Sequence, residues 1–313
     1  MSVYKVLITD GLDSNGIAIL KKFTEVVEMT GITPEDLLTE IADYDALIVR
    51  GRTKVTPAVF DAAKKLKVVG RAGVGVDNID LNAAKAHSVT VVNSPVATTT
   101  AVAELTMALM LNAVREVARA DASLKAGKWL KKEFEGTELS GKTLGVIGFG
   151  RIGAAVAKRA AAFDMAVLGY DPMIPADEII KRGGKPVGMD DLLKQSDIIT
   201  MHLPLTDTTR GMISKDAFTK MKQGAYLICA ARGGVIDEAA LLESLNSGKL
   251  AGAALDVFAA EPPGLTDLVV HPKLVCTPHV GAQTIEAQRR AANDIAEEVA
   301  AALNGQPLRW KVV

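Results

Sequence analysis

The chain has 313 residues, which exceeds the roughly 150 residues of one typical domain, so we expect two domains. Hydrophobic residues make up 49% of the sequence and aromatic residues 4%, so Ala, Val, Leu and Ile must build the core, as in α/β proteins with buried parallel strands. The 36 Lys and Arg nearly balance the 37 Asp and Glu. This balance gives no support to nucleic acid or a membrane surface as a general partner.

The cysteines and the N-terminal residues indicate the cellular compartment in which we expect the protein. Cys229 and Cys276 are too few for a disulfide framework or a zinc cluster, and both lie in apolar runs. We therefore expect inert buried thiols, no metal site and a cytoplasmic protein. Residues 1–20 lack the basic start and apolar stretch of a signal peptide, and no run of about 18 apolar residues predicts a membrane span.

Residues 1–97 alternate between short β-branched runs and segments with helical spacing of apolar residues. Strands are predicted at 3–9, 46–50, 67–73 and 89–93. From residue 98 to 127 the apolar residues keep a helical spacing, which predicts one long helix at a domain or subunit contact. We place a domain boundary after residue 97.

A second series of strands and helices follows. Its strands are predicted at 142–150, 165–171, 198–204, 225–231, 250–258 and 274–280. Such a series is expected to form a parallel sheet with right-handed crossovers. A final helix is predicted from Thr284 to Asn304, and with the tail after it this helix must pack back on earlier structure. The predicted domains are therefore 98–284 and a discontinuous domain of 1–97 plus 285–313.

The segment GVIGFGRIGAAVAKRAAAFDMAVLGYDP carries the first chemical motif. Gly148, Gly150 and Gly153 form G-x-G-x-x-G between an apolar strand and a helix, and Asp171 ends the next strand. The glycines allow a tight turn, the approach of a pyrophosphate and close helix packing, while the helix N-terminus favours negative charge. A glycine-rich turn with only a structural role would not explain Asp171. A carboxylate there accepts hydrogen bonds from the adenosine ribose and repels a 2′-phosphate, which favours NAD over NADP.

Three further polar residues each follow a predicted strand of the second series. Arg232 follows AYLICAA and precedes two glycines, Glu261 lies in DVFAAEPP, and His279 lies in LVCTPHVGA. Ligands of open α/β sheets bind beyond the carboxyl ends of the strands, so we expect these side chains at one ligand-binding edge. A single histidine would more often have a structural role, but an arginine, an acid and a histidine together indicate catalysis.

The motifs VLITD, VVGRAGVGVDNIDL, GKTLGVIGFGRIG, ARGGVIDE, AGAALDVFAAEPP and TPHVGAQT occur in this order. Together they identify the chain as a member of the D-isomer-specific 2-hydroxyacid dehydrogenase family. The resemblance implies two doubly wound parallel-sheet α/β domains, a Rossmann NAD-binding domain at 98–284 and a smaller flavodoxin-like substrate-binding domain from 1–97 plus 285–313. It also implies a homodimer held largely through the nucleotide domain, and a small-molecule 2-hydroxy or 2-keto acid as the substrate.

The resemblance also implies roles for single residues. Arg232 would bind the substrate carboxylate and carbonyl, His279 would be the acid/base, and Glu261 would support His279. The backbone of Gly73, Val74 and Gly75 would hold the substrate carboxylate. The implied cofactor-binding set is Thr99, Gly148, Gly150, Arg151, Ile152, Gly153, Asp171, Ala230 and Asp256, with Asp256 near the nicotinamide amide and Thr99 lining the nicotinamide site.

Two features depart from the family pattern. Thr98 stands where many relatives have Asn, which leaves open whether Thr98 makes the contact of that Asn. The sequence ends at Val313, so we expect neither a C-terminal regulatory domain nor feedback inhibition through one.

The residue types fit reduction of a 2-keto acid independently of the family. Hydride from the nicotinamide must reach the substrate C2, and the oxygen that becomes the hydroxyl needs a proton. Histidine suits this transfer because its unperturbed pKa of about 6.5 lies close to working pH. A Glu261 carboxylate would favour the protonated ring, and the planar fork of Arg232 can hold carboxylate and carbonyl together.

Arg50, Arg52 and Lys54 follow a strand of the first domain and bear on substrate choice. They can be read as a solvated basic turn, but the resemblance favours a substrate phosphate bound by Arg50 and Arg52, although Gly51 replaces a serine common at that place. Reduction of hydroxypyruvate or glyoxylate and oxidation of D-lactate remain alternatives. The family also includes NADH-sensing corepressors, against which the intact Arg232, Glu261 and His279 argue.

Overall fold

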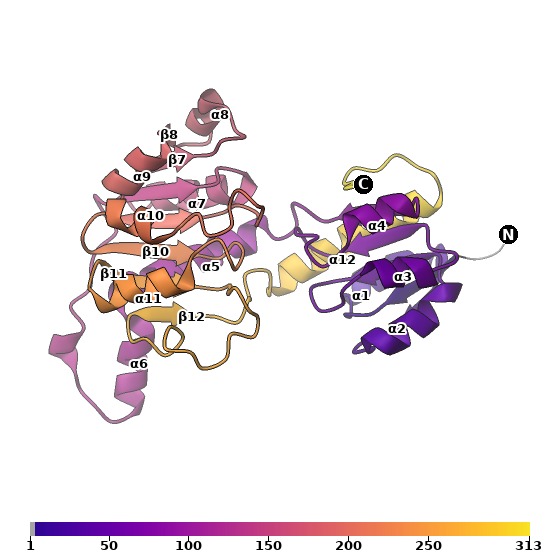
Figure 1. Ribbon diagram of the computed structural model, residues 1–313, viewed down its shortest axis with the longest axis horizontal. Coiled ribbons are helices and arrows are strands. Elements are labelled where there is room, and N and C mark those ends of the chain that lie inside the picture. The colour runs from indigo at the N-terminus through magenta and orange to yellow at the C-terminus, as the bar shows by residue number, and fades with distance from the viewer. Residues whose placement is uncertain (1–3) are drawn as a thin grey trace. The chain divides into compact units, whose positions relative to one another are not determined.

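The computed structural model describes residues 4–313. The chain divides into two compact units, one of Met1–Thr98 with Ala282–Val313 and the other of Thr99–Gly281 (Figure 1). The units thus divide after residues 98 and 281, where the sequence predicts boundaries after 97 and 284. Residues 282–284 therefore lie in the first unit.

The first unit is a five-stranded parallel sheet with helices on its faces. Its strands are β1 (Tyr4–Ile8), β2 (Thr24–Glu28), β3 (Ala46–Val49), β4 (Val68–Arg71) and β5 (Thr90–Asn93), in the order β2-β1-β3-β4-β5. Its helices are α1 (Ser14–Leu20), α2 (Pro34–Glu40), η1 (Ile41–Asp43), α3 (Pro57–Ala62), α4 (Leu81–Ala86) and α12 (Ile285–Leu303). This strand order is the flavodoxin-like one. The prediction of a flavodoxin-like parallel sheet is confirmed, although β2, an edge strand with a glutamate at its second and last positions, escaped the strand pattern.

Helix α12 completes the first unit. The Thr284 side chain caps its N-terminus by accepting from the Ala287 amide at 3.1 Å, and Asn304 is its C-cap, so the helix with its two caps matches the predicted range. Its buried face packs on α1, β4 and β5, so both ends of the chain build one core. A Cβ at Gly16 of α1 would lie 2.6 Å from the Ala292 carbonyl oxygen, so only glycine allows this close helix packing.

The second unit is a seven-stranded parallel sheet. Its strands are β6 (Thr143–Ile147), β7 (Ala166–Tyr170), β8 (Lys185–Pro186), β9 (Ile198–Met201), β10 (Ala225–Cys229), β11 (Leu250–Leu255) and β12 (Leu274–Cys276), in the order β12-β11-β10-β9-β6-β7-β8. The strand order reverses between β6 and β9, which is the Rossmann switch point. The predicted Rossmann sheet is therefore confirmed. Strand β8 has two residues, one of them proline, and is too short to produce a periodic pattern.

Helices cover both faces of this second sheet. The helices of this unit are α5 (Thr99–Arg115), α6 (Val117–Lys125), η2 (Lys131–Glu133), α7 (Arg151–Ala161), α8 (Ala176–Lys181), α9 (Met189–Gln195), α10 (Lys215–Lys220) and α11 (Glu238–Asn246), of which α6 and η2 do not cover the sheet. Helices α9, α10 and α11 pack into one apolar cluster, and α5 and α7 pack into a second cluster on the other face (Figure 1). Among the helices of residues 4–313, none combines the length and apolar character of a membrane span.

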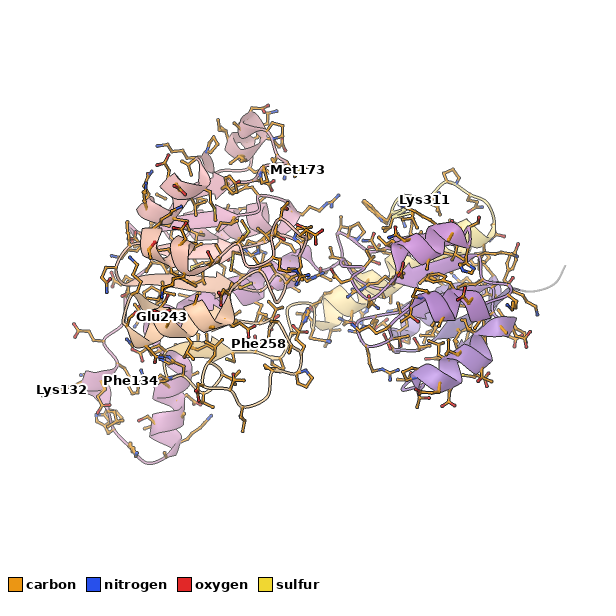
Figure 2. All side chains as sticks on the ribbon, in the orientation of Figure 1. Lys132, Phe134, Met173, Glu243, Phe258 and Lys311 are labelled. Carbon is orange, nitrogen blue, oxygen red and sulfur yellow. The ribbon has the colours of Figure 1, made fainter. Side chains whose placement is uncertain are left out.

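The prediction of one long helix over 98–127 is wrong. Glu116 has a left-handed φ of 50°, which ends α5 and starts α6 in a new direction. The spacing of apolar residues is helical on both sides of this break, so periodicity cannot reveal it. Helix α5 is largely buried, whereas α6 has no buried residue. In the segment after α6, Lys132 and Phe134 lie away from the sheet (Figure 2).

Candidate functional site

The three glycines after β6 have separate structural reasons. Gly148 has a left-handed φ of 88°, and a Cβ there would lie 2.4 Å from the carbonyl oxygen of His202. A Cβ at Gly153 would lie 2.1 Å from the Gly148 carbonyl oxygen, so α7 can approach the turn only with glycine at that place. A Cβ at Gly150, by contrast, would meet no atom within 4 Å. The second glycine therefore borders open space rather than packed protein.

This open space lies at the N-terminus of α7, whose N-cap Gly150 has no side chain to satisfy the first amides. Such a helix end binds phosphate groups through its N–H groups and dipole. Arg151 and Ile152 form the first turn of α7. The residues present thus fit the pyrophosphate of a dinucleotide.

Asp171 directly follows β7, the neighbour of β6. Its Oδ2 accepts from the Phe149 amide and its Oδ1 from the Met173 amide, both at 2.8 Å. The carboxylate is therefore fixed beside the glycine turn. Each oxygen keeps an acceptor position that a ribose hydroxyl could use.

His279 and Glu261 form a direct pair. The Nδ1 of His279 lies 2.8 Å from Oε2 of Glu261, and Oε1 of Glu261 accepts from the Phe258 amide at 3.1 Å. Since a carboxylate only accepts, Nδ1 of His279 carries the proton of this contact. The side chain of His279 is 49% exposed, so its Nε2 is the nitrogen able to exchange a proton with a ligand.

Asp256, the residue that follows β11, holds the turn that carries His279. Its Oδ1 accepts from Thr277 Oγ1 at 2.6 Å and from the Val280 amide at 2.8 Å, and its Oδ2 accepts from the Gly281 amide at 2.8 Å. The Asp256 carbonyl also accepts from the His279 amide at 2.8 Å. Asp256 is 1% exposed, so the structure gives this carboxylate a supporting role that the sequence did not reveal. Its contact with a nicotinamide amide stays a prediction.

Arg232 follows β10, so the three residues Arg232, Glu261 and His279 follow the adjacent strands β10, β11 and β12. The Arg232 guanidinium donates to the Ala231 carbonyl at 2.7 Å. A Cβ at Gly233 would lie 1.7 Å from the Phe258 carbonyl oxygen, so this glycine brings the Arg232 turn against the segment that leads to Glu261. Ala230, also after β10, is buried, and Thr99 is the first residue of α5.

In the first unit, Asp10 organises the turn that carries Arg50 and Arg52, the two residues expected to bind a substrate phosphate. Its Oδ2 accepts from the amides of Arg50 at 2.8 Å and Thr53 at 3.1 Å, and its Oδ1 accepts from Thr53 Oγ1 at 2.6 Å. Burial opposes ionisation of Asp10, but these hydrogen bonds and the charge of Arg52 outweigh it and lower the pKa of the carboxyl. Sequence analysis missed this residue, whose only signal was its place after the first strand.

The two arginines of this turn differ in their contacts. Arg52 Nε lies 3.3 Å from Asp10 Oδ1, and its Nη2 donates to the Thr9 carbonyl at 2.8 Å, so Arg52 is engaged in the fold. Among residues 4–313, the Arg50 guanidinium makes only a long contact of 3.5 Å, from Nη2 to Gln283 Oε1. Burial lowers the pKa of Arg50, and Asp10 partly offsets this effect. Arg50 is thus the better placed of the two to bind an anion.

The backbone of Gly73–Gly75 also suits an anion. The Gly73 amide donates to the Arg71 carbonyl at 2.8 Å. Within residues 4–313, no group accepts from the amides of Val74 or Gly75. A carboxylate could therefore use these two N–H groups, but not that of Gly73.

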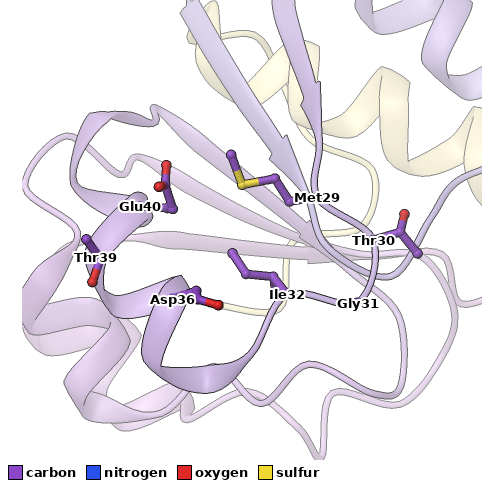
Figure 3. Close-up of a pocket in the computed structure, with 7 residues that line it drawn as sticks. All are labelled: Met29, Thr30, Gly31, Ile32, Asp36, Thr39 and Glu40. Carbon is purple, nitrogen blue, oxygen red and sulfur yellow. The ribbon is translucent and has the colours of Figure 1, made fainter.

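Two surface hollows within single units lie away from these residues. One of about 450 Å³ lies beside Met29 and Ile32, and Asp36 and Glu40 line it (Figure 3). The two carboxylates make it unsuitable for an anionic keto acid. Another, of about 230 Å³, lies at the break between α5 and α6. No cluster of three His, Cys, Asp or Glu able to hold a metal occurs in the described part of the chain.

Burial shifts the pKa values of His202 and of the two cysteines. Nε2 of His202, after β9, lies 3.0 Å from Thr200 Oγ1, while its buried Nδ1 finds no hydrogen-bond partner among residues 4–313. Burial lowers the pKa of His202 to about 3, so the ring is neutral beneath the glycine turn. Both cysteines are free, and burial raises the pKa of each thiol to about 11, which makes them unreactive, although Cys276 is only partly buried.

Comparison with known proteins identifies the family of the chain. Residues 107–281 match the family described as "D-isomer specific 2-hydroxyacid dehydrogenase, NAD binding domain". D-3-phosphoglycerate dehydrogenase of Methanocaldococcus jannaschii is 50% identical over 303 residues, which cover 96% of this chain and 58% of that protein. D-3-phosphoglycerate dehydrogenase 2, chloroplastic, of Arabidopsis thaliana is 48% identical over 304 residues, which cover 96% of this chain and 49% of that protein.

A glyoxylate reductase from Paecilomyes thermophila has a similar structure, with a TM-score of 0.91 at 30% identity, covering 100% of this chain and 99% of the other. The chain spans between 49% and 58% of the length of the two D-3-phosphoglycerate dehydrogenases. The family match covers more than half of the chain, and the glycine turn, Asp171 and the His279–Glu261 pair lie within it. The chain belongs to the D-isomer specific 2-hydroxyacid dehydrogenase family.

Proposed function

We propose that the protein is an NAD-dependent dehydrogenase that interconverts a D-2-hydroxy acid and its 2-keto acid. The observation that carries the proposal is the His279–Glu261 pair at 2.8 Å, in the same unit as the glycine turn and Asp171. NADH, when bound, supplies the hydride for the substrate C2. Nε2 of His279 donates a proton to the substrate oxygen during reduction and accepts it during oxidation. Glu261 holds the ring through Nδ1 and so leaves Nε2 to exchange the proton.

Arg232 orients the substrate in this proposal. Its planar fork binds the carboxylate and the carbonyl oxygen together, which lysine could not do as well. The amides of Val74 and Gly75 in the first unit are the proposed backbone donors to the substrate carboxylate. The first unit is thus the substrate-binding domain and the second the nucleotide-binding domain.

The substrate pair that we propose is D-3-phosphoglycerate and 3-phosphohydroxypyruvate, which places the protein in serine biosynthesis. The motifs resemble those of D-3-phosphoglycerate dehydrogenases, and relatives of that name are 50% and 48% identical. Arg50 supplies a cation for the phosphate, with Arg52 and Asp10 shaping its turn. The test is kcat/KM with NADH for 3-phosphohydroxypyruvate, hydroxypyruvate, glyoxylate and pyruvate. Preference for the phosphorylated acid is expected, and preference for another would contradict the assignment.

Hydroxypyruvate or glyoxylate reduction is the second candidate. A glyoxylate reductase shares the fold over essentially the whole chain, with a TM-score of 0.91. The same substrate series decides between the two activities. D-lactate oxidation would appear as a preference for pyruvate, and an NADH-sensing corepressor would bind NADH without turnover.

NAD rather than NADP is the proposed cofactor because the Asp171 carboxylate lies beside the glycine turn. Asp171→Ser removes both a ribose acceptor and the charge that repels a 2′-phosphate. We expect weaker NADH binding and a smaller preference for NADH over NADPH, measured as the ratio of the two kcat/KM values. An unchanged ratio would show that another residue discriminates.

We also propose a cytoplasmic homodimer. Helix α6 and the segment after it expose apolar side chains: Val117 is 55%, Leu124 59% and Trp129 80% exposed. A second copy covering them would explain a helix with no buried residue. Light scattering should give twice the mass of the chain, and Leu124→Glu should favour the monomer. The two free thiols are consistent with a reducing compartment.

A further inference from the structure

The last residues of the chain extend the sheet of the first unit. The Val91 amide donates to the Val313 carbonyl at 3.1 Å, and the Val312 amide donates to the Val91 carbonyl at 2.8 Å. Farther along, the Asn93 amide donates to the Trp310 carbonyl at 3.2 Å. Residues 310–313 therefore run antiparallel along β5, the edge strand of the parallel sheet.

A buried carboxylate anchors this segment. Glu298 of α12 is 2% exposed, and its Oε2 accepts from the amides of Arg309 at 3.0 Å and Trp310 at 2.9 Å. Its Oε1 accepts from Arg309 Nε at 2.9 Å. Charge-assisted hydrogen bonds of this kind are stronger than neutral ones, and a buried carboxylate depends on keeping its partners. The path of the segment is thus fixed where it meets β5.

Asn93 connects this segment to the backbone of Gly73–Gly75. While its amide donates to Trp310, its side-chain Nδ2 donates to the Val74 carbonyl at 2.7 Å. The next residue, Ser94, donates its amide to the Gly73 carbonyl at 2.9 Å and its Oγ to the Ala291 carbonyl of α12 at 3.1 Å. Both carbonyls of the turn are therefore held from the side of β5 and α12.

Fixing these carbonyls also fixes the amides. In a planar trans peptide the C=O and the following N–H point in opposite directions. The Gly73 carbonyl shares its peptide with the Val74 amide, and the Val74 carbonyl shares its peptide with the Gly75 amide. Holding both carbonyls toward β5 turns both N–H groups away from it, and these are the two amides without an acceptor among the described residues.

We propose that Asn93 is a positioning residue for the substrate carboxylate, and that the C-terminal segment held by Glu298 and Arg309 sets its position. The inference rests on the proposed function, in which the Val74 and Gly75 amides bind that carboxylate. Asn93 itself touches no substrate. It acts by orienting one peptide of the anion-binding turn while the segment at Trp310 fixes its own backbone.

The test compares Asn93→Ala and Asn93→Asp with the wild type in steady-state reduction of 3-phosphohydroxypyruvate by NADH. A lost neutral hydrogen bond is worth about 0.5–1.5 kcal/mol, so Asn93→Ala should raise KM about 3- to 10-fold. We expect kcat to change by less than about threefold and the NADH dissociation constant, measured by fluorescence, to stay unchanged, because the cofactor residues lie in the second unit.

Asn93→Asp separates positioning from simple destabilisation. At pH 7.5 the introduced carboxylate faces the Val74 carbonyl as a second acceptor, so KM should rise more than in Asn93→Ala. At pH 5 the introduced carboxyl is partly protonated and can donate to Val74 again, so its KM, relative to the wild type at the same pH, should fall toward the wild-type value. A merely structural loss would show no such recovery.

A matched pair of variants tests the role of the C-terminal segment. Arg309→Ala removes a charge-assisted partner of Glu298 and should raise KM about 2- to 5-fold. Lys311→Ala, an exposed change two residues farther along, should leave KM unchanged. If the wild type turns over no 2-keto acid, the proposed function fails. If the wild type is active but KM is unchanged in both Asn93 variants, or NADH binding weakens as much as substrate binding, the positioning role alone is overturned.

Discussion

At the scale of single residues, one contact decides which ring nitrogen of His279 can exchange a proton. Nδ1 of His279 is held by Glu261 at 2.8 Å, so Nε2 is the ring nitrogen left to exchange a proton with a ligand. Asp256 in turn holds the backbone on both sides of His279, through the Thr277 hydroxyl and the Val280 and Gly281 amides. The histidine is thus fixed both at its ring and at its backbone, which leaves little reorganisation for catalysis.

Removing the Glu261 carboxylate should weaken the hold on the His279 ring. Glu261→Ala removes the acceptor that keeps the proton on Nδ1, so Nε2 is no longer the only nitrogen available for proton transfer. We expect kcat to fall about 10- to 100-fold in reduction and in oxidation alike, because one charge-assisted contact is lost and both directions pass through the same transition state. Steady-state kinetics in both directions measures the two losses. Glu243→Gln, at an exposed carboxylate paired with Lys215, is the control and should leave kcat unchanged, and a wild-type kcat in Glu261→Ala would contradict the role of the pair (Figure 2).

His202 should contribute to the pH dependence of stability. Its pKa is lowered to about 3 in the folded state, against about 6.5 when unfolded. Between these values the unfolded chain binds a proton that the folded chain does not. The contribution of His202 to the free energy of unfolding is therefore present in full above about pH 6.5 and is lost as the pH drops toward 3. The loss is up to about 1.4 kcal/mol per pH unit.

His202→Gln should remove this component. Between pH 7.5 and 5.5 the melting temperature of the wild type should fall about 3–6 °C more than that of the variant, since the loss is about 1.4 kcal/mol and each kcal/mol shifts the melting temperature by about 2–4 °C for a unit of this size. Differential scanning calorimetry at the two pH values gives the comparison. Identical pH dependence of the two proteins would show that His202 protonates as readily in the folded state as in the unfolded chain.

At the scale of elements, the polar residues come from turns that follow parallel strands. The sequence predicted the positions of Arg232, Glu261, His279 and Arg50 because such turns can be recognised from the apolar runs before them. It did not predict Asp10, whose partners are Arg50 and Thr53, about forty residues away. Contacts at this separation depend on the pairing of β1 with β3, which no local pattern encodes. The break at Glu116 escaped prediction because both flanking helices keep the same apolar period.

In the turn after β3, Arg50 should matter for phosphate binding and Arg52 for stability. Arg50→Ala should lower kcat/KM for 3-phosphohydroxypyruvate about 10- to 100-fold, since one charge-assisted contact is worth about 1.5–3 kcal/mol. Activity on hydroxypyruvate, which has no phosphate, should change less than about threefold. Arg52→Ala removes contacts to Asp10 and the Thr9 carbonyl, so it should also lower the melting temperature.

These outcomes can be separated by measuring both substrates and the melting temperature for each variant. Lys54→Ala, on the same exposed turn, is the matched control and should leave the melting temperature unchanged. Equal losses on both substrates in Arg50→Ala would show that Arg50 serves folding rather than phosphate binding.

At the scale of the whole molecule, the alternation of strands and helices predicted two parallel sheets, and the strand orders are flavodoxin-like and Rossmann. The pattern also predicted that the C-terminal helix returns to earlier structure, because an amphipathic helix needs a core to cover. Strands β2 and β8 could not be predicted, since one carries charges at an edge and the other has two residues. The side-chain contacts within the site depend on how three adjacent strands are paired, and they required the structure.

In the proposed dinucleotide-dependent reduction, His279 transfers the proton. The most direct test is kcat of His279→Ala with NADH and 3-phosphohydroxypyruvate, together with the NADH dissociation constant from fluorescence. General acid catalysis predicts a loss of kcat of about 10²- to 10⁴-fold with unchanged NADH affinity, because the glycine turn and Asp171 are untouched. Turnover near the wild-type rate in this variant would contradict the assignment of His279 as the acid.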